Sequence, residues 1–193
     1  MKVNEIFYSL QGEGHYTGTP AVFIRFSGCN LRCWFCDTDF QSGTQMTEDE
    51  ILAEVRRYPA SHVVITGGEP TLQLTSTLVE ALHAEGHYVM METNGTHPLP
   101  TDCLVDWITC SPKLVDGRVA TLRIQRIDEL NVFYEAQDMQ LYADITASEY
   151  RLQPCDTGDA ERNKTILAQT IDYLLNHPKW KLSLQTHKIL NVR

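Results

Sequence analysis

Ala21-Val-Phe-Ile-Arg-Phe26 is followed, after Ser27-Gly28, by Cys29-Asn-Leu-Arg-Cys33-Trp-Phe-Cys36. The first run is apolar apart from one arginine, which predicts a buried strand. The cysteines after it have the spacing Cys-x3-Cys-x2-Cys. Three thiolates on one short loop can bind three irons of a cubane iron–sulfur cluster and leave the fourth iron open to a small molecule. A structural zinc site needs a fourth Cys or His, typically from a second close pair, and the sequence has no such pair. We therefore favour a cluster.

The composition is that of an ordinary acidic globular chain. Its 193 residues are 42% hydrophobic and 21% charged, and the formal net charge is −9. At this length we expect one domain, 1–193, which buries about 70% of the surface that the unfolded chain exposes. Because a nucleic-acid surface needs a basic patch, we expect no nucleic-acid partner.

The chain shows no targeting signal. Its N-terminus lacks the apolar core and small-residue cleavage site of a signal peptide. No apolar run approaches the ~20 residues that cross a bilayer, so we expect no membrane association. The six cysteines are then more consistent with thiols or metal ligands than with disulfides. These features indicate a reducing compartment, most simply the cytoplasm.

Apolar runs, caps and breakers predict strands that alternate with helices. Strands are expected at 21–26, 62–66, 87–92, 105–110, 130–135, 150–153 and 180–185. Helices are expected at 51–58, after a capping box at Thr47, and at 70–84 and 159–176. This alternation predicts a parallel sheet covered by helices. About six βα units are too few for a closed eight-fold barrel.

Five polar motifs each follow an expected strand. They are the cysteine loop, Gly67-Gly-Glu69-Pro70, Glu92-Thr-Asn-Gly95, Ser111-Pro-Lys113 and Gln153-Pro154. The carboxyl ends of parallel strands share one edge of the sheet, and ligands bind beyond that edge. We therefore expect these five motifs to surround one pocket.

Most of these motifs also have a simple structural explanation. Gly-Gly-x-Pro and Asn-Gly are common in turns. Asp37-Thr38 alone is typical of a helix cap, and Lys113 or His187 alone of a solvated side chain. Arg25 differs, because an unpaired guanidinium inside an apolar strand is costly. It either forms a structural salt bridge or binds a carboxylate in a bidentate fork, and we favour the carboxylate.

The cysteine spacing after a first strand resembles the signature loop of the radical S-adenosylmethionine (SAM) enzymes. Three further segments are similar to the 7-carboxy-7-deazaguanine synthases within that superfamily: Ser9-Leu-Gln-Gly-Glu-Gly14, Cys36-Asp37-Thr38 and Gln185-Thr-His-Lys-Ile-Leu-Asn191. The resemblance runs from Asn4 to the last residue. It implies an α/β fold, a partial and open βα barrel of the radical SAM type.

The resemblance also implies a reaction and its cofactors. The family are lyases that convert 6-carboxy-5,6,7,8-tetrahydropterin to 7-carboxy-7-deazaguanine with loss of ammonia, in the biosynthesis of queuosine and related 7-deazapurines. They use a 4Fe–4S cluster, SAM and Mg²⁺. An external reductant of the flavodoxin or ferredoxin type supplies electrons, and the family precedent is a homodimer.

Site residues follow from the same resemblance. Cys29, Cys33 and Cys36 hold the cluster, and Thr38 binds Mg²⁺ with Asp37 as an outer acceptor. The expected cofactor contacts are Phe35, Cys36, Asp37, Glu69, Gly95, Ser111, Pro112, Lys113 and Gln153. The expected substrate contacts are Leu10, Gln11, Gly12, Glu13, Arg25, Thr93 and His187. Side chains such as Gln and Glu suit a pterin edge, which presents adjacent donors and acceptors. The alternative for 10–13 is a flexible turn before the first strand.

Two other functions stay open at this point. A glycyl-radical activase has the same cluster loop but gives no reason for Gln11, Glu13 and Arg25 to occur together. A zinc-stabilised binding module has no catalysis, and analysis for iron and acid-labile sulfide separates it from both enzymes. Two segments depart from the family: the stretch between Thr38 and the helix at 51 is short, and 117–150 matches poorly.

Overall fold

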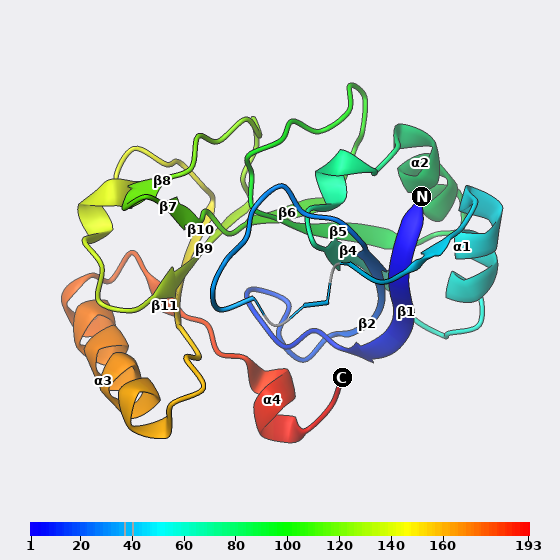
Figure 1. Ribbon diagram of the computed structural model, residues 1–193. Helices are drawn as coiled ribbons and strands as arrows, with labels where there is room; N and C mark the ends of the chain where they lie inside the picture. Colours follow the sequence, from blue (N-terminus) through cyan, green and yellow to red (C-terminus); the bar gives the residue numbers. More distant parts are fainter. Residues whose placement is uncertain (37, 40) are drawn as a thin grey trace.

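The computed structural model describes residues 1–36, 38–39 and 41–193 (Figure 1). Its central feature is a nine-stranded sheet with the order β11-β10-β9-β6-β5-β4-β2-β1-β3. The strands are β1 (Lys2–Leu10), β2 (Pro20–Phe26), β3 (Thr44–Gln45), β4 (His62–Gly67), β5 (Tyr88–Thr93), β6 (Trp107–Cys110), β9 (Glu129–Tyr134), β10 (Glu149–Pro154) and β11 (Lys181–Leu182). A separate hairpin pairs β7 (Leu114–Val115) with β8 (Arg118–Val119).

From β2 to β11 every neighbouring pair is parallel, and the strands follow one another in chain order. The sheet begins at β3 and ends at β11, and within the described residues these two edges do not pair. The sheet is therefore open, which confirms the predicted partial βα barrel. The carboxyl ends of β2 and of the strands parallel to it face the same rim, as the sequence predicted, whereas the antiparallel β1 ends at the opposite rim.

Strand β1 was missed by the sequence analysis, which wrongly placed the first strand at 21–26. β1 pairs antiparallel with β2 and carries a register shift between Val3 and Glu5. Because a bulge interrupts the alternation of apolar and polar residues, only Val3 and Phe7 of this strand are buried. The segment 10–13, for which a flexible turn was the alternative to a substrate contact, therefore continues from the end of a nine-residue strand.

Helices cover the two ends of the sheet and leave its middle thinly covered (Figure 1). The helices are α1 (Glu48–Val55), α2 (Ser76–Ala84), α3 (Ala160–Asn176) and α4 (Thr186–Leu190), with short 3₁₀ turns at η1 (Pro70–Leu72) and η2 (Met139–Tyr142). Figure 1 shows α1 and α2 together at one end and α3 at the other. None of the helices in the described part of the chain has the length and apolar character that crossing a bilayer requires.

Local caps explain where the helices begin. Thr47 and Glu50 form the predicted capping box at α1. The predicted helix over 70–84 is interrupted, because the Thr75 hydroxyl accepts a hydrogen bond from Leu78 N at 3.2 Å and starts α2 afresh. The predicted strand at 180–185 is confirmed only at 181–182, since α4 begins at Thr186.

Strand periodicity turns one face of β2 to the helices and the other to a cavity. Val22, Ile24 and Phe26 are fully buried in the core beneath α1 and α2. Phe23 and Arg25, on the opposite face, line the cavity. A second core beneath α3 includes Leu130, Val132 and Leu152. The two-residue repeat of the strand thus places Arg25 on the cavity side.

Candidate active site

One cavity of about 640 Å³ lies along the inner face of the sheet, from carboxyl strand ends at Thr93 and Ser111 to the first residues of β6 and β9, Trp107 and Glu129. A cavity of this size accommodates a cofactor together with a small substrate. The predicted site residues that line it are Leu10, Gln11, Gly12, Glu13, Arg25, Cys29, Cys33, Phe35, Cys36, Thr38, Thr93, Ser111, Lys113 and His187. The described residues on its wall do not include Glu69, Gly95, Pro112 or Gln153. Asp37 lies outside the described residues.

The three-cysteine loop forms one wall and is held by the end of β4. Gly68 N donates to Phe26 O at 3.1 Å, and Glu69 N donates to Gly28 O at 2.9 Å. A Cβ atom on Gly68 would lie 2.0 Å from the carbonyl oxygen of Gly28. The strand end therefore packs directly on the loop, an approach that only glycine permits at this position.

The donor set of this loop fits a cubane cluster. Burial raises the pKa values of the Cys29 and Cys33 thiols, and the charge of Cys36 raises both further. Gathered thiolates repel one another, and iron cations remove that cost. The described residues contain no three His, Cys, Asp or Glu side chains placed to hold a single metal ion. A cubane instead takes one thiolate at each of three irons.

Glu69 joins the ends of β4 and β5 from behind the cavity wall. Its fully buried carboxylate accepts from Thr71 N at 3.2 Å, Thr71 Oγ1 at 2.6 Å and Thr93 Oγ1 at 2.7 Å through Oε1. Oε2 accepts from Asn94 N at 2.8 Å. Four donors satisfy the carboxylate without a cation. The side chain thus fixes Thr93 and Asn94, which themselves line the cavity.

Lys113 brings a positive charge beside the cysteine loop. Its Nζ donates to Ser111 Oγ at 2.7 Å and lies 4.4 Å from the ring centre of Phe133 and 5.7 Å from that of Phe35. Burial lowers the pKa of the amine, whereas the charges of Cys33 and Glu13 act in the opposite direction. The amine therefore lies at the end of the cavity that the cysteine loop lines.

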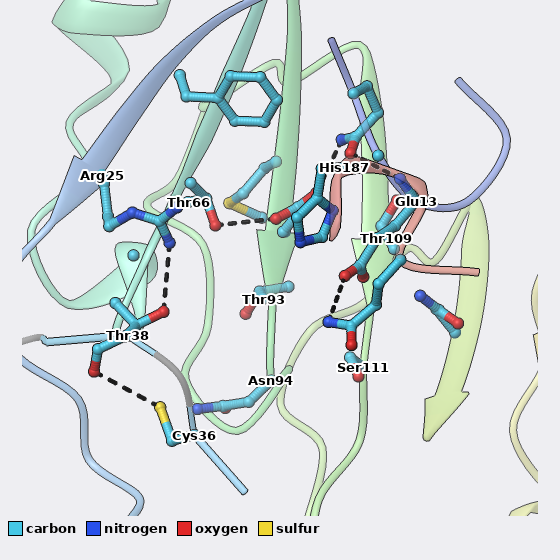
Figure 2. A pocket seen from close by; sticks show the side chains of 18 of the residues that line it. Glu13, Arg25, Cys36, Thr38, Thr66, Thr93, Asn94, Thr109, Ser111 and His187 are labelled. Carbon is cyan, nitrogen blue, oxygen red and sulfur yellow. Dashed lines mark hydrogen bonds between the residues drawn. The ribbon is translucent and has the colours of Figure 1, made fainter. Parts of the chain in front are cut away.

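Arg25 forms a structural salt bridge with Glu5, one of the two alternatives from the sequence, and it also lines the cavity. Nε donates to Glu5 Oε1 at 3.0 Å, and Nη1 donates to Thr38 Oγ1 at 3.3 Å. Figure 2 shows Arg25 and Thr38 facing each other at one side of the cavity, with Cys36 beside Thr38. The guanidinium is thus oriented by two protein contacts before any ligand binds.

The loop between β1 and β2 is fixed by a carboxylate on the cavity floor. Gln11 Nε2 donates to Glu92 Oε1 at 2.8 Å, and Gln11 Oε1 accepts from Glu13 N at 3.1 Å. The other oxygen of Glu92 accepts from Thr66 Oγ1 at 2.9 Å. The orientation of the Gln11 amide is therefore set, because an ionised carboxylate accepts only from its nitrogen.

Glu129 is a buried carboxylate on the cavity wall that the sequence analysis did not identify. Oε2 accepts from His15 N at 2.6 Å, and Arg151 Nε lies 3.7 Å away. Oε1 is buried and has no hydrogen-bond partner among the described residues. Burial raises the pKa of Glu129 to about 7. Buried polar atoms are almost always paired, so this oxygen suits a ligand that donates an N–H.

The segment after β11 closes the cavity from the other side. Thr186 N and Oγ1 both donate to Gly12 O, at 2.9 and 2.8 Å. A Cβ atom on Gly12 would lie 2.2 Å from His187 Nδ1, so the imidazole packs directly on the glycine. Gln185 Nε2 donates to Glu13 Oε1 at 3.0 Å. In Figure 2, His187 and Glu13 lie on the side opposite Arg25.

Three other predicted residues support the wall from behind. Gln153 is fully buried in β10, where its Oε1 accepts from Ser183 Oγ at 2.6 Å and Asn131 Nδ2 at 3.2 Å. Gly95 adopts a positive φ of 77°, and a Cβ atom there would lie 2.6 Å from Cys110 Sγ. Pro112 is buried between Ser111 and Lys113. The structure thus shows them as a second layer beneath the cavity surface.

Several cavity residues were missed by the sequence analysis. They include Glu5, Thr66, Glu92, Asn94, Glu129, Asn131 and Arg193. Glu92 and Asn94 belong to the strand-end motif Glu92-Thr-Asn-Gly95, and Thr66 is the last residue of the strand expected at 62–66. The alternation of side chains along each strand was the signal that could have identified them as facing the cavity. Glu129 is a charged residue at the start of an apolar strand, the same signal that identified Arg25. Arg193 carries no local signal, because it meets the cavity only through the fold.

Comparisons with known proteins agree with this geometry. A profile described as the radical SAM superfamily matches residues 23–132. The 7-carboxy-7-deazaguanine synthase of Bacteroides thetaiotaomicron is 55% identical over 192 residues, which span 100% of this chain and 98% of that protein. The enzyme of the same name from Bordetella pertussis is 42% identical, with 98% of each chain covered. A crystal structure of QueE from Escherichia coli matches with a TM-score of 0.76 and 32% identity, covering 95% of this chain and 92% of that one.

Proposed function

Because the chain belongs to the 7-carboxy-7-deazaguanine synthases of the radical SAM superfamily, we propose that it is a lyase that converts 6-carboxy-5,6,7,8-tetrahydropterin to 7-carboxy-7-deazaguanine with loss of ammonia. This reaction belongs to the biosynthesis of queuosine and related 7-deazapurines. One observation carries the proposal for this chain. A single cavity joins the three-cysteine loop to Arg25 and to the buried acceptor Glu129. A radical source, a carboxylate site and an N–H acceptor are what this conversion needs.

We propose that Cys29, Cys33 and Cys36 hold a 4Fe–4S cluster at the loop. When bound, such a cluster would supply the electron for the reductive cleavage of SAM, and with it the radical chemistry of the reaction. The chain's own part is to place SAM. Lys113 offers its ammonium group to the SAM carboxylate. Gly68 and Asn94 line the cavity next to the cysteine loop, and the Glu69 carboxylate holds the backbone N–H of Asn94.

We propose that Arg25 binds the substrate carboxylate and that Thr38 binds Mg²⁺ beside it. Thr38 Oγ1 accepts one hydrogen bond from Arg25 and keeps a second lone pair for a metal ion. Mg²⁺ prefers oxygen ligands and keeps several waters, so a single protein ligand suits it when the substrate supplies oxygens. Asp37, outside the described residues, is proposed as an outer acceptor.

The far end of the cavity suits the ring of a pterin. Glu129 Oε1, buried and without a protein donor in the described part of the chain, accepts from a ring N–H or exocyclic amine. Gln11, Gly12 and Glu13 line the cavity beside it, and His187 packs over Gly12. Together these groups exclude water and hold the substrate against the cofactor in one orientation. The 10–13 segment is thus proposed as the pterin-edge contact.

We also expect a single domain over 1–193, a homodimer, an external reductant of the flavodoxin or ferredoxin type, and cytoplasmic location. The near-complete coverage of named relatives supports the single domain. All six cysteines are free thiols, which suits a reducing compartment. Exposed Cys36 gives an electron donor access to the cluster edge.

The test is an anaerobic assay of reconstituted protein with SAM, dithionite, Mg²⁺ and 6-carboxytetrahydropterin, read by mass spectrometry. We expect 7-carboxy-7-deazaguanine from the wild type and from Cys103→Ala, a cysteine outside the cavity, and no product from Cys33→Ala. Cleavage of SAM with unchanged pterin would leave an activase as the better hypothesis. A colourless protein that contains zinc and no acid-labile sulfide would remove both enzymes.

A further inference from the structure

Glu129 is a buried acid of the cavity, and one of its oxygens is left bare. The side chain is fully buried at the first position of β9 and lines the cavity. Oε2 accepts from His15 N at 2.6 Å, whereas Oε1 has no hydrogen-bond partner in the part of the chain that the structure describes. A Cβ atom on Gly14 would lie 2.1 Å from Oε1, so the chain at this point can place no side chain there. Burial with so few donors favours the protonated carboxyl group.

Three other acidic side chains of the cavity have partners that stabilise the carboxylate. Glu92 accepts with one oxygen from Gln11 Nε2 at 2.8 Å and with the other from Thr66 Oγ1 at 2.9 Å. Glu5 forms ion pairs with two arginines. Hydrogen bonds, above all from a backbone N–H, lower the pKa of Asp156 to about 2. Such contacts favour the ionised form, which has no proton to give.

Glu129 is faced by an arginine, two further carboxylates and a histidine. Arg151 Nε lies 3.7 Å from Oε2, but Arg151 Nη2 also donates to Glu149 at 3.1 Å. The charge of Arg151 favours ionisation of Glu129, and the charges of Glu92 and Glu149 oppose it. Burial outweighs the arginine and raises the pKa of Glu129 to about 7. The side chain of His15 lines the cavity, lies 4.0 Å from Glu149 and is 40% exposed, so it links this end of the cavity to solvent.

We propose that Glu129 is the general acid that protonates the amine lost as ammonia. This inference rests on the proposed function, and it assigns the ligand nitrogen at Oε1 to the one that leaves. An amine is expelled from carbon readily only when a proton reaches its nitrogen as the bond breaks.

The step balances within the substrate and this one side chain. The carbon–nitrogen bond breaks, its electron pair stays on nitrogen, and the nitrogen takes the Glu129 proton and leaves as ammonia. The neighbouring ring carbon loses a proton as the carbon–carbon double bond of the five-membered ring forms. Glu129 takes up that proton and is ready for the next turnover, so no further reactant is needed. A carboxyl group whose pKa lies near neutral pH can act in both directions.

The experiment follows a single turnover of reconstituted protein with SAM, dithionite, Mg²⁺ and 6-carboxytetrahydropterin by mass spectrometry. In Glu129→Gln, we expect the release of ammonia and 7-carboxy-7-deazaguanine to slow by about 10²-fold or more, and consumption of the substrate to slow far less. An isomer of the substrate that keeps the amine should accumulate. Glu129→Asp keeps the acid and should release ammonia faster than Glu129→Gln. Glu54→Gln, on the exposed side of α1, is the control.

Infrared spectroscopy of the reconstituted protein without reductant tests the acid apart from turnover. We expect a band from a protonated, buried carboxyl group that falls to half its intensity near pH 7 and is missing in Glu129→Gln. Absence of this band from wild type below pH 7 would overturn the inference, because the side chain would then have no proton to give. Equal slowing of substrate consumption and ammonia release in Glu129→Gln would also overturn it, since Glu129 would then only position the substrate. So would ammonia release at the wild-type rate. A wild type that shows the band but forms no 7-carboxy-7-deazaguanine would overturn the proposed function itself.

Discussion

Replacing Glu129 by glutamine tests the electrostatics of the cavity without any cofactor. The side chain is fully buried at the first position of β9. Glutamine has the same shape and keeps an oxygen for the amide of His15, which lies 2.6 Å from Oε2. The substitution therefore removes the titration and preserves the packing. Its effect on the free energy of unfolding reports the cost of holding a charge at this position.

The size and sign of the effect follow from the pKa. Burial raises the pKa of Glu129 from an ordinary value of 4.5 to about 7. Between these values the folded protein binds more protons than the unfolded chain, so the free energy of unfolding falls as pH rises. The penalty is absent below pH 4.5 and complete above pH 7. A difference of about 2.5 pH units, at ~1.36 kcal/mol each, gives a penalty of about 3 kcal/mol.

The assay is urea denaturation of the apoprotein at several pH values from 5 to 8. We expect wild type to lose about 2–3 kcal/mol more than Glu129→Gln across this range. Glu50→Gln is the control, because hydrogen bonds from Thr47 lower the pKa of Glu50 and place its titration below the range. It should shift the curve by a constant amount. Parallel pH profiles for wild type and Glu129→Gln would refute the reasoning.

Three further substitutions test the fold by the same denaturation assay. Thr47→Ala removes the hydroxyl that accepts from Glu50 N in the capping box on α1 and should cost about 1 kcal/mol; an unchanged midpoint would contradict the cap. Ile65→Ala leaves a cavity at the fully buried centre of β4 and should lower the free energy of unfolding by about 2–5 kcal/mol, whereas Ile65→Val should lower it by about 1 kcal/mol. Equal losses for the two variants would contradict tight packing around Ile65. Gly68→Ala forces a Cβ atom against Gly28 O and should lower the free energy of unfolding by about 1–3 kcal/mol. It should also lower the amount of iron bound after reconstitution, and full iron content would contradict the contact between Gly68 and the cysteine loop.

The parallel strands were predictable because their apolar runs are continuous and end at glycines or polar residues. β2, β4 and β5 are buried on both faces, so their sequences stand out without any knowledge of neighbours. β1 was not predictable in the same way, since its bulge at residues 3–5 interrupts the pattern. The end of the chain differs as well, because α4 depends on the contact between Thr186 and Gly12. Tertiary contacts, rather than local preference, decide these two segments.

The site was predictable where a residue type is unusual in its local surroundings. Three close cysteines and an arginine in an apolar strand are such cases, and the structure brings them to one cavity. That a residue belongs to one of the strand-end motifs does not predict whether its side chain faces the cavity. Glu69 and Gln153 lie behind the wall because neighbouring donors enclose them. Residues such as Arg193 escape sequence reasoning entirely, because their partners are almost the whole chain away.

The order of the strands has a consequence for synthesis on the ribosome. Strands β2 to β11 pair with neighbours in the order in which they are made, so the sheet can grow as the chain emerges. The rim of the cavity is different, because the contacts of Gly12 with Thr186 and of Glu5 with Arg193 can form only after the end of the chain has been made. We therefore expect nascent chains to carry a folded but unsealed cavity until residues 185–193 leave the exit tunnel.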